Sequence, residues 1–250
     1  MSDPTDVKVY RARLYNDYGE VFQSAPERFD TQAAARWGRA YRYYLRALLP
    51  ESKDARIVDL ACGYGRLLYF FREQGYRHIT GVDVSPGQVA RANEVVCDVV
   101  QMNALDFLED HRGEFDLITG LDLIEHLTKV EVLRFLDGCF AALKPGGRLV
   151  LQTPNADSPF GMAIRYGDIT HEVCFNPNAL ARLLAQTGFR EIKAREVGPV
   201  PWGYSLLSSV RYMVWQVIRA GLLLWNVAET GSGRSWVLTR NFLISGKRGE

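Results

Sequence analysis

An aspartate precedes a glycine-rich turn near residue 60. Asp59 lies in the apolar run Arg56–Leu60, and Gly63 and Gly65 follow before a helix is expected to begin. A loop of this composition brings backbone amides close to a ligand at the start of a helix. The Asp59 carboxylate would repel a pyrophosphate and attract an ammonium group. The turn therefore predicts a cationic ligand. It also lacks the third glycine of a dinucleotide loop, because Leu68 stands at that position.

Asp83 is a second acidic residue placed for ligand binding. It ends the run His78–Asp83, 18 residues after Gly65, where a carboxylate can accept hydrogen bonds from both hydroxyls of an unphosphorylated ribose. A nucleoside that carries an amino acid satisfies both Asp59 and Asp83. Asn103 follows the next predicted strand and could contact the edge of an adenine, although a short polar turn explains that residue equally well.

The elements that must position these residues alternate along the chain. A helical lead-in at 1–50 precedes them. Short β-branched runs predict strands at 56–60, 78–83, 99–103, 115–119 and 148–153, and helices are predicted at 65–74 and 129–143. Such alternation forces mostly parallel strand pairing with helices on both faces of the sheet. The sequence therefore predicts a doubly wound α/β fold.

The alternation loosens after residue 154. A helix at 177–187 and strands at 189–197 and 237–245 are predicted, and two stretches fall outside the repeat. The stretch 155–176 is expected to form an active-site loop over the carboxyl end of the sheet, where open α/β sheets bind ligands. The stretch 198–236 is expected to form a helical insertion or cap, so that residues 1–250 make up one domain.

The composition narrows the classes of function. The chain has 250 residues, with 30 Lys and Arg against 29 Asp and Glu, so its net charge of +1 disfavours a general binder of nucleic acid. A charged fraction of 24% and a hydrophobic fraction of 47% exclude disorder as the main state. The four cysteines form no C-x-x-C pair, and the amino terminus lacks the basic start and apolar run of a signal peptide. These features predict a cytoplasmic protein.

Five short motifs occur in a fixed order along the chain. They are Asp59-Leu-Ala-Cys-Gly-Tyr-Gly65, Gly81-Val-Asp-Val-Ser85, Phe115-Asp116, Asp122-Leu-Ile-Glu-His126 and Leu143-Lys-Pro-Gly-Gly147. In order and spacing this set resembles the motifs of class I S-adenosylmethionine-dependent methyltransferases, over residues 55–195. The resemblance implies S-adenosylmethionine as the cofactor and a seven-stranded sheet whose last strand is antiparallel. One departure is Ala61, where the family usually has glycine.

The same resemblance implies which residues contact the cofactor. The expected contacts are Asp59, Ala61, Gly63, Gly65, Asp83, Val84, Asn103, Ala104 and Leu121. The segment 169–177 is further similar to a stretch in small-molecule O-methyltransferases of ubiquinone biosynthesis and of sugar modification. The motif of amino-methylating nucleic-acid enzymes is absent after the fourth strand, where Gly120-Leu-Asp122 stands.

The expected reaction is therefore O-methylation of a small-molecule or glycan hydroxyl. An alternative acceptor is a prenylated quinone-like ring. From other classes, a nicotinamide-dependent oxidoreductase and a non-catalytic cofactor-binding subunit stay open. Binding of S-adenosylhomocysteine and of NADH would separate these classes.

Transfer of a methyl group to a hydroxyl needs alignment and a base that takes the proton. His171 is the first candidate, because it lies in the predicted active-site loop and an ordinary histidine pKa of about 6.5 suits the task. A hydrogen bond from His171 to backbone is the competing interpretation. His126 is the second candidate for a catalytic role, and the favoured competing interpretation is a structural role beside Glu125. Asp122 is expected near the sulfonium or the acceptor, or as a helix cap. A divalent ion held by Asp122, Glu125 and His171 is conceivable, but the sequence offers no recognisable spacing for it, so no metal is predicted.

The insertion contains an amphipathic segment. Apolar residues recur at helical spacing between Ser205 and Ala228, and Arg211 and Arg219 lie outside the apolar stripe. Such a helix could rest at a membrane interface, receive a lipid-linked acceptor, or pack on the domain or on a second subunit of a homodimer. Its longest unbroken apolar run is too short to span a bilayer. Three tyrosines of the lead-in could close over the cofactor or pack the amino-terminal helices; they are Tyr10, Tyr15 and Tyr18.

Overall fold

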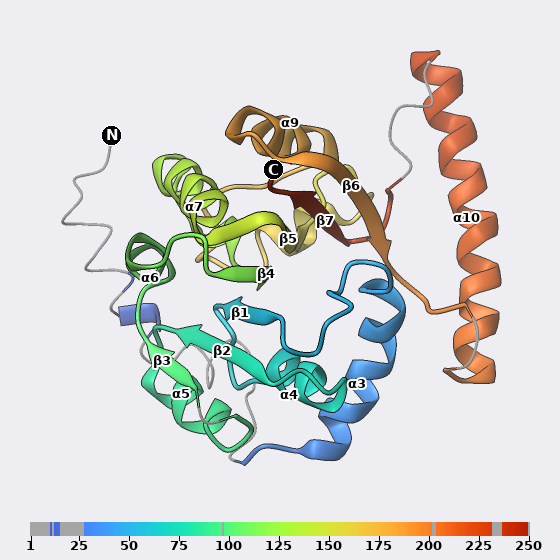
Figure 1. Cartoon of the computed structure of the whole chain (residues 1–250). Coiled ribbons are helices and arrows are strands. Elements are labelled where there is room, and N and C mark those ends of the chain that lie inside the picture. Colours follow the sequence, from blue (N-terminus) through green and yellow to red (C-terminus); the bar gives the residue numbers. More distant parts are fainter. Residues whose placement is uncertain are drawn as a thin grey trace.

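The computed structural model of the chain describes residues 11, 13–15, 28–96, 98–201, 204–231 and 237–249. Seven strands of this part form one sheet in the order β3-β2-β1-β4-β5-β7-β6 (Figure 1). Their bounds are β1 Arg56–Leu60, β2 His78–Asp83, β3 Val99–Gln101, β4 Phe115–Leu121, β5 Leu143–Pro154, β6 Arg190–Val197 and β7 Asn241–Lys247. The strands β1 to β5 pair in parallel, whereas β7 runs antiparallel to both β5 and β6. The predicted fold class is confirmed.

Helices cover both faces of this sheet (Figure 1). Their bounds are α3 Thr31–Tyr44, α4 Arg66–Glu73, α5 Pro86–Ala92, α6 Ala104–Asp110, α7 Lys129–Ala142, α8 Gly161–Arg165, α9 Pro177–Thr187 and α10 Leu206–Thr230, with a 3-10 turn η1 at Ile124–His126. Neighbouring β4 residues alternate between two apolar cores. Ile118 packs in the core that includes Phe135 of α7, and Leu117 packs in the core that includes Phe71 of α4. Both faces of the central strands are therefore buried, as expected for parallel strands between helices.

The strands β1, β2 and β3 follow one another from the centre of the sheet to one edge, and the chain then returns to the centre with β4 and continues toward the other edge. The strand order therefore reverses between the neighbours β1 and β4. Parallel strands end at the same edge, and the helices that follow β1 and β4 leave toward opposite sides. This reversal is the point where open α/β sheets leave a crevice for ligands. The glycine-rich turn after β1 and the segment 121–126 after β4 both lie there.

Several predicted bounds differ from the structure. The third strand ends at Gln101, because the Asn103 side chain accepts a hydrogen bond from Leu105 N and so begins α6. The fifth strand begins early, since Leu143 pairs with Phe115. The last strand is displaced from 237–245 to Asn241–Lys247, and the lead-in helix ends at Tyr44.

Helix α10 lies in the predicted insertion, between β6 and β7. It stands beside the body of the molecule at the end of β6 (Figure 1). No helix in the described ranges has the length and apolar character needed to cross a membrane. Trp202 and Trp236, at the two ends of the insertion, lie outside the described residues.

Candidate functional site

Two hollows meet at the carboxyl ends of β1, β2 and β4. The larger has a volume of about 420 Å³ and includes Asp83, Asn103 and His126 in its walls. The smaller, of about 310 Å³, includes Asp59 and Trp37. Four residues line both hollows, namely Ala61, Gly63, Leu121 and Asp122. The two hollows therefore form one crevice with two arms that join beside the glycine-rich turn.

The Asp83 carboxylate lies in the larger arm and is held by backbone amides. Gly63 N donates to Oδ2 and Ser85 N donates to Oδ1, each at 2.9 Å. Burial raises the pKa of Asp83 in spite of these bonds, which favour the charged form. Because each oxygen keeps further acceptor capacity, the carboxylate can still receive two hydroxyl donors. Val84 and Ala104 also line this arm.

Asp59 marks the smaller arm and is almost fully buried. Thr119 Oγ1 donates to Asp59 Oδ1 at 2.7 Å. Burial raises the pKa of Asp59 to about 7, and the nearby charge of Asp83 adds to this effect. A carboxylate with so little solvent gains most from a cationic ligand group, since such a group restores the charged form.

Ala61 adopts a left-handed backbone with φ of 56°. An alanine side chain crowds the following carbonyl in this conformation, whereas glycine adopts it without strain. Residue 61 therefore adopts a backbone conformation that suits the glycine usual in the family, although the residue here is alanine. Gly65 also has positive φ, and a side chain there would meet Ala92 of α5 at 3.2 Å.

Helix α3 supplies two residues of the crevice that the sequence analysis did not identify. Trp37 and Tyr41 line the smaller arm, and their rings stack with centroids 3.7 Å apart. Tyr41 Oη donates to Gln152 Oε1 at 2.8 Å, and Gln152 Nε2 donates to Asp122 at 3.0 and 3.1 Å. A polar chain therefore links the lead-in helix to the junction of the arms. The sequence shows the aromatic residues of α3, but it does not show that two of them face the crevice.

Asp122 stands at the junction of the two arms. Its backbone is left-handed, with φ of 54°, a conformation that aspartate tolerates better than most residues. The side chain faces the open crevice, and the protein that surrounds it raises the pKa of Asp122 to about 6. The alternative prediction, that Asp122 caps the following helix, is wrong, because Leu123 is the N-cap residue of η1.

His126 lines the larger arm, and His171 lies behind it with ring centroids 4.8 Å apart. Thr170 Oγ1 donates to Asp168 Oδ1 at 2.6 Å and lies 2.9 Å from His126 Nδ1. Because the hydroxyl has one proton, His126 Nδ1 must be the donor in the second bond, which puts the imidazole lone pair on Nε2. Burial and the neighbouring His171 lower the pKa of His126 to about 4, so the ring is neutral at pH 7.

Glu125 completes a cluster with these two histidines. Each of Glu125, His126 and His171 offers a ligand atom, and the three atoms lie within 4.8 Å of one another. Thr153 Oγ1 donates to Glu125 Oε2 at 2.9 Å, while Glu125 Oε1 and His171 Nδ1 are buried and have no hydrogen-bond partner among the residues that the structure describes. Such a set could hold a divalent cation. The sequence suggested Glu125 and His171 for such an ion together with Asp122, whereas the structure groups these two residues with His126.

The remaining wall of the larger arm comes from the lead-in. Arg11 and Tyr15 line it, and the Arg11 guanidinium binds the Glu131 carboxylate at 2.6 and 2.9 Å. Arg11 also donates to the backbone oxygen of His126 at 2.9 Å. Tyr15 therefore lies against the crevice, as one of the predicted alternatives required, whereas Tyr10 and Tyr18 lie outside the described residues.

Residues 29–194 match a family described as a methyltransferase domain. The chain belongs to this family. The resemblance to class I S-adenosylmethionine-dependent methyltransferases is thereby confirmed, and with it S-adenosylmethionine as the cofactor. The two acidic arms of the crevice accordingly suit the ribose and the amino-acid part of that molecule.

Curated relatives carry more specific names. A ubiquinone biosynthesis O-methyltransferase of Pseudomonas aeruginosa is 33% identical over 107 residues, which cover 40% of this chain and 44% of that protein. A protein of the same name from Aromatoleum aromaticum is 26% identical over 180 residues, covering 64% of this chain and 76% of that protein. The matched part of this chain thus spans about half the length of the first of these relatives.

Solved structures show the same fold. A methyltransferase from Archaeoglobus fulgidus aligns with a TM-score of 0.62 and 22% identity over 85% of this chain and 94% of that chain. The 1,6-didemethyltoxoflavin-N1-methyltransferase of Burkholderia thailandensis, with bound S-adenosylhomocysteine, aligns with a TM-score of 0.59 and 18% identity over 100% of this chain and 92% of that chain.

Proposed function

We propose that the chain transfers the methyl group of S-adenosylmethionine to the hydroxyl oxygen of a small molecule. The arrangement that supports this most directly is the junction of the two arms, where Asp122 lies beside the glycine-rich turn, together with His126 in the wall of the larger arm. With Asp59 in the arm for the amino acid and Asp83 in the arm for the ribose, the sulfonium that joins these parts falls at that junction. Asp122 then lies near the reacting centre and favours its positive charge.

His126 takes the acceptor proton in this proposal. As the acceptor oxygen bonds to the methyl carbon, the bond from that carbon to sulfur breaks and S-adenosylhomocysteine is formed. The hydroxyl proton passes to Nε2 of His126, whose ring is held by Thr170 and Asp168. His171, the base expected from the sequence, lies against His126 with ring centroids 4.8 Å apart and helps to fix the orientation of that ring. Its role is that of a positioning residue.

A planar aromatic hydroxyl is the acceptor class that the crevice favours over a saccharide. The walls of the larger arm are mostly apolar and include Leu123, Leu127 and Met102. The curated relatives are named as O-methyltransferases of ubiquinone biosynthesis, which agrees with a quinone-like ring. A saccharide would instead need polar groups and an exposed aromatic platform. A glycan or lipid-linked hydroxyl is the second candidate.

Turnover with labelled cofactor tests the proposal. The full chain is incubated with S-adenosylmethionine labelled in its methyl group, together with a catechol that carries a prenyl tail or with a hydroxylated sugar. We expect a labelled methyl group bonded to the catechol oxygen, and binding of S-adenosylhomocysteine but not of NADH. Binding of NADH alone would indicate an oxidoreductase. Tight S-adenosylhomocysteine binding without transfer to any hydroxyl would indicate a non-catalytic subunit.

The compartment is part of the proposal. The described cysteines are free thiols, which suits a reducing cytoplasm; they are Cys62, Cys139 and Cys174. The segment 205–228, which was expected to contact a membrane or a second subunit, lies on a surface outside the crevice.

A further inference from the structure

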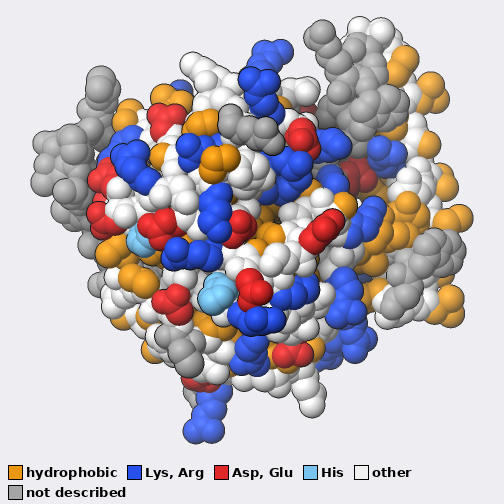
Figure 2. Space-filling view, viewed as in Figure 1, with side chains coloured by type: hydrophobic (Ala, Val, Ile, Leu, Met, Phe, Trp, Pro, Cys, Tyr) orange, Lys and Arg blue, Asp and Glu red, His pale blue; other side chains and the backbone are white. Residues whose placement is uncertain are grey.

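Helix α10 exposes an apolar face along its whole length. It has 25 residues and is therefore about 37 Å long. Ten of the nineteen exposed large hydrophobic side chains in the described ranges lie on it: Leu206, Leu207, Val210, Met213, Val214, Val217, Ile218, Leu224, Trp225 and Val227. Figure 2 shows this apolar surface along one side of the molecule. Apolar patches of this extent mark interaction sites.

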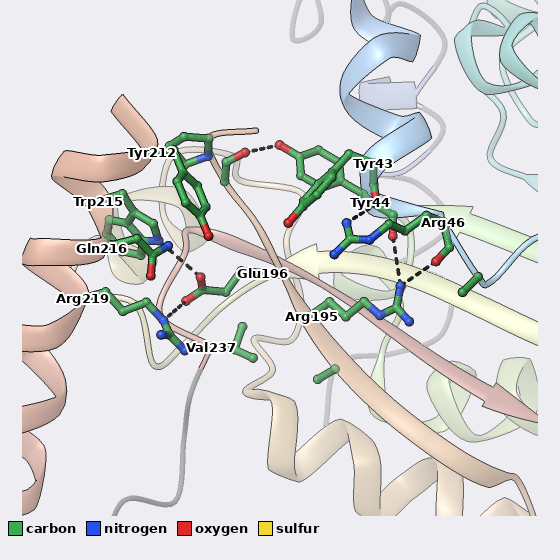
Figure 3. Close-up of a pocket in the computed structure, with 14 residues that line it drawn as sticks. Tyr43, Tyr44, Arg46, Arg195, Glu196, Tyr212, Trp215, Gln216, Arg219 and Val237 are labelled. Atoms are coloured by element: carbon green, nitrogen blue, oxygen red, sulfur yellow. Dashed lines mark hydrogen bonds and ion pairs between the residues drawn. The ribbon is translucent and has the colours of Figure 1, made fainter. Parts of the chain in front are cut away.

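The opposite face of α10 is fixed to the body by polar bonds. Ser208 Oγ donates to Val200 O at 2.9 Å, and Trp215 Nε1 and Arg219 Nε donate to the Glu196 carboxylate at 3.3 and 3.2 Å (Figure 3). The apolar face is therefore held outward by Glu196. The charged side chains between Leu206 and Ala228 are two arginines: Arg219 binds Glu196, and Arg211 is exposed on α10.

Two hollows rich in arginine are lined by α3 and its C-terminal end, and one of them lies between that part of the body and α10. One, of about 650 Å³, lies among α3, β6 and α10, and the other, of about 640 Å³, lies among α3, α4 and the segment that leads into α10. Their walls contain five arginines and two acidic residues: Arg39, Arg42, Arg46, Arg195, Arg219, Glu73 and Glu196. Helix α3 itself contains no acidic residue. Lys and Arg side chains accordingly gather beside the apolar surface (Figure 2).

The positive charge of these hollows is not balanced locally. Arg195 donates to the backbone oxygen of Arg46 at 2.8 Å, and no carboxylate of the described residues forms an ion pair with it (Figure 3). Burial and the charges of Arg46 and Arg148 lower the pKa of Arg195. An anion in this place would relieve that repulsion.

We propose that α10 docks the protein on an anionic lipid bilayer, with its apolar face among the acyl chains and the arginines of α3 facing the lipid phosphates. A helix with one apolar face and adjacent basic residues lies in the plane of the bilayer interface and binds anionic lipids best. A second copy of the chain fits less well. In a symmetric dimer both copies contribute the same patch to the interface. The arginine-rich border of one copy would then meet that of the other, and the like charges would repel.

Flotation with lipid vesicles tests the docking without any variant. We expect the full chain to float with vesicles of phosphatidylcholine and phosphatidylglycerol, and to stay unbound with vesicles of phosphatidylcholine alone. High salt should weaken binding to the mixed vesicles. Equal binding to both kinds of vesicle, or to neither, would overturn the proposal.

One variant tests the apolar face. Val217→Glu puts a charge where 74% of the side chain is exposed on α10, and Val130→Glu makes the same change at 70% exposure on α7. We expect Val217→Glu to weaken vesicle binding about tenfold or more, because a buried charge is costly, and Val130→Glu to leave it unchanged. Similar binding by both variants would contradict the proposal.

A second variant tests the arginines. Arg39→Gln/Arg42→Gln should reduce binding to the mixed vesicles by roughly fivefold for each arginine, whereas Arg112→Gln/Arg182→Gln removes the same charge elsewhere and should have little effect. Thermal stabilisation by S-adenosylhomocysteine verifies that each variant is folded. A dimer in light scattering that Val217→Glu dissociates, in a protein that binds no vesicles, would identify self-association instead.

Insertion has its own optical signature. Trp225 is 68% exposed on the apolar face, so brominated acyl chains should quench part of the fluorescence of the wild-type protein. Trp225→Phe should lose most of that quenching. Quenching that is unchanged in Trp225→Phe would overturn insertion of this face. Failure of these tests leaves the proposed methyl transfer untouched, since none of the changed residues lines the cofactor crevice.

Discussion

Thr119 of β4 donates a hydrogen bond of 2.7 Å to the Asp59 carboxylate of β1. The bond joins the two strands at the place where the strand order reverses. It fixes the orientation of a carboxyl whose pKa burial raises to about 7. Below that pH the group is protonated in the ligand-free protein, and a cationic ligand favours its deprotonation.

Cofactor binding should therefore depend on pH through Asp59. We expect the affinity for S-adenosylhomocysteine to rise between pH 5 and pH 7, by at most about tenfold per pH unit, and to level off above pH 7. Asp59→Asn should weaken binding and remove most of this slope. Calorimetry across the pH range measures both. A slope that persists in Asp59→Asn would assign the proton to another group.

The same group affects stability in the absence of ligand. Because its folded pKa is raised above the ordinary value of 3.8, the folded state binds the proton more tightly than the unfolded state. The contribution of Asp59 to the free energy of unfolding is therefore greatest at low pH and falls as pH rises from about 4 to about 7. Denaturant unfolding of the wild type and of Asp59→Asn should diverge across this range.

The proposed base makes a prediction about the pH profile of kcat. Since the pKa of His126 is lowered to about 4, its protonation should not reduce kcat between pH 8 and pH 6. His126→Gln should lower kcat about a hundredfold or more while S-adenosylhomocysteine still binds. His171→Gln should lower kcat less and shift the profile. An acid limb near pH 6 that disappears in Asp122→Asn would instead identify Asp122 as the base.

Chelation tests the other use of the cluster around Glu125. A base needs its lone pair for the proton, so the proposed mechanism predicts that methyl transfer survives dialysis against EDTA. Activity that is lost on dialysis and restored by a divalent cation would show that Glu125, His126 and His171 bind a metal ion. Glu125→Gln distinguishes the outcomes further, since it would then abolish the restoration.

Ala61 provides a prediction about stability. Its left-handed φ of 56° costs an alanine about 1 kcal/mol relative to glycine. Ala61→Gly should therefore raise the free energy of unfolding by up to that amount, offset in part by the greater freedom of glycine in the unfolded chain. Cofactor affinity should stay within a few fold of the wild type. Ala92→Gly on α5 is a control in ordinary helical backbone, and we expect it to destabilise the protein.

The sequence was sufficient for the sheet because its strands are short apolar runs between helices. The bounds of β1 and β2 were predicted without error, and Asp59 and Asp83 lie in the crevice that their positions implied. These residues depend on local structure and on the common edge of parallel strands. Local pattern also predicted the amphipathic helix α10.

The catalytic side of the site could not be predicted in the same way. His126 was expected only as the second catalytic candidate after His171, yet it is His126 that lines the crevice, and His171 packs against it. The choice between the two histidines depends on how the segment 155–176 folds onto η1. Backbone hydrogen bonds from Glu172 N and Val173 N to Glu125 O determine that arrangement. Trp37 and Tyr41 were missed for a similar reason, since periodicity gives the faces of a helix but not their neighbours.

Helix α3 has two faces that serve different ligands. Trp37 and Tyr41 contact the crevice, while Arg39 and Arg42 line the hollow among α3, α4 and the segment before α10. A helix of 14 residues moves as a rod, so a displacement on one face reaches the other. Occupation of the arginine hollow and occupation of the crevice are therefore thermodynamically linked, and each must alter the affinity of the other by the same factor if α3 shifts.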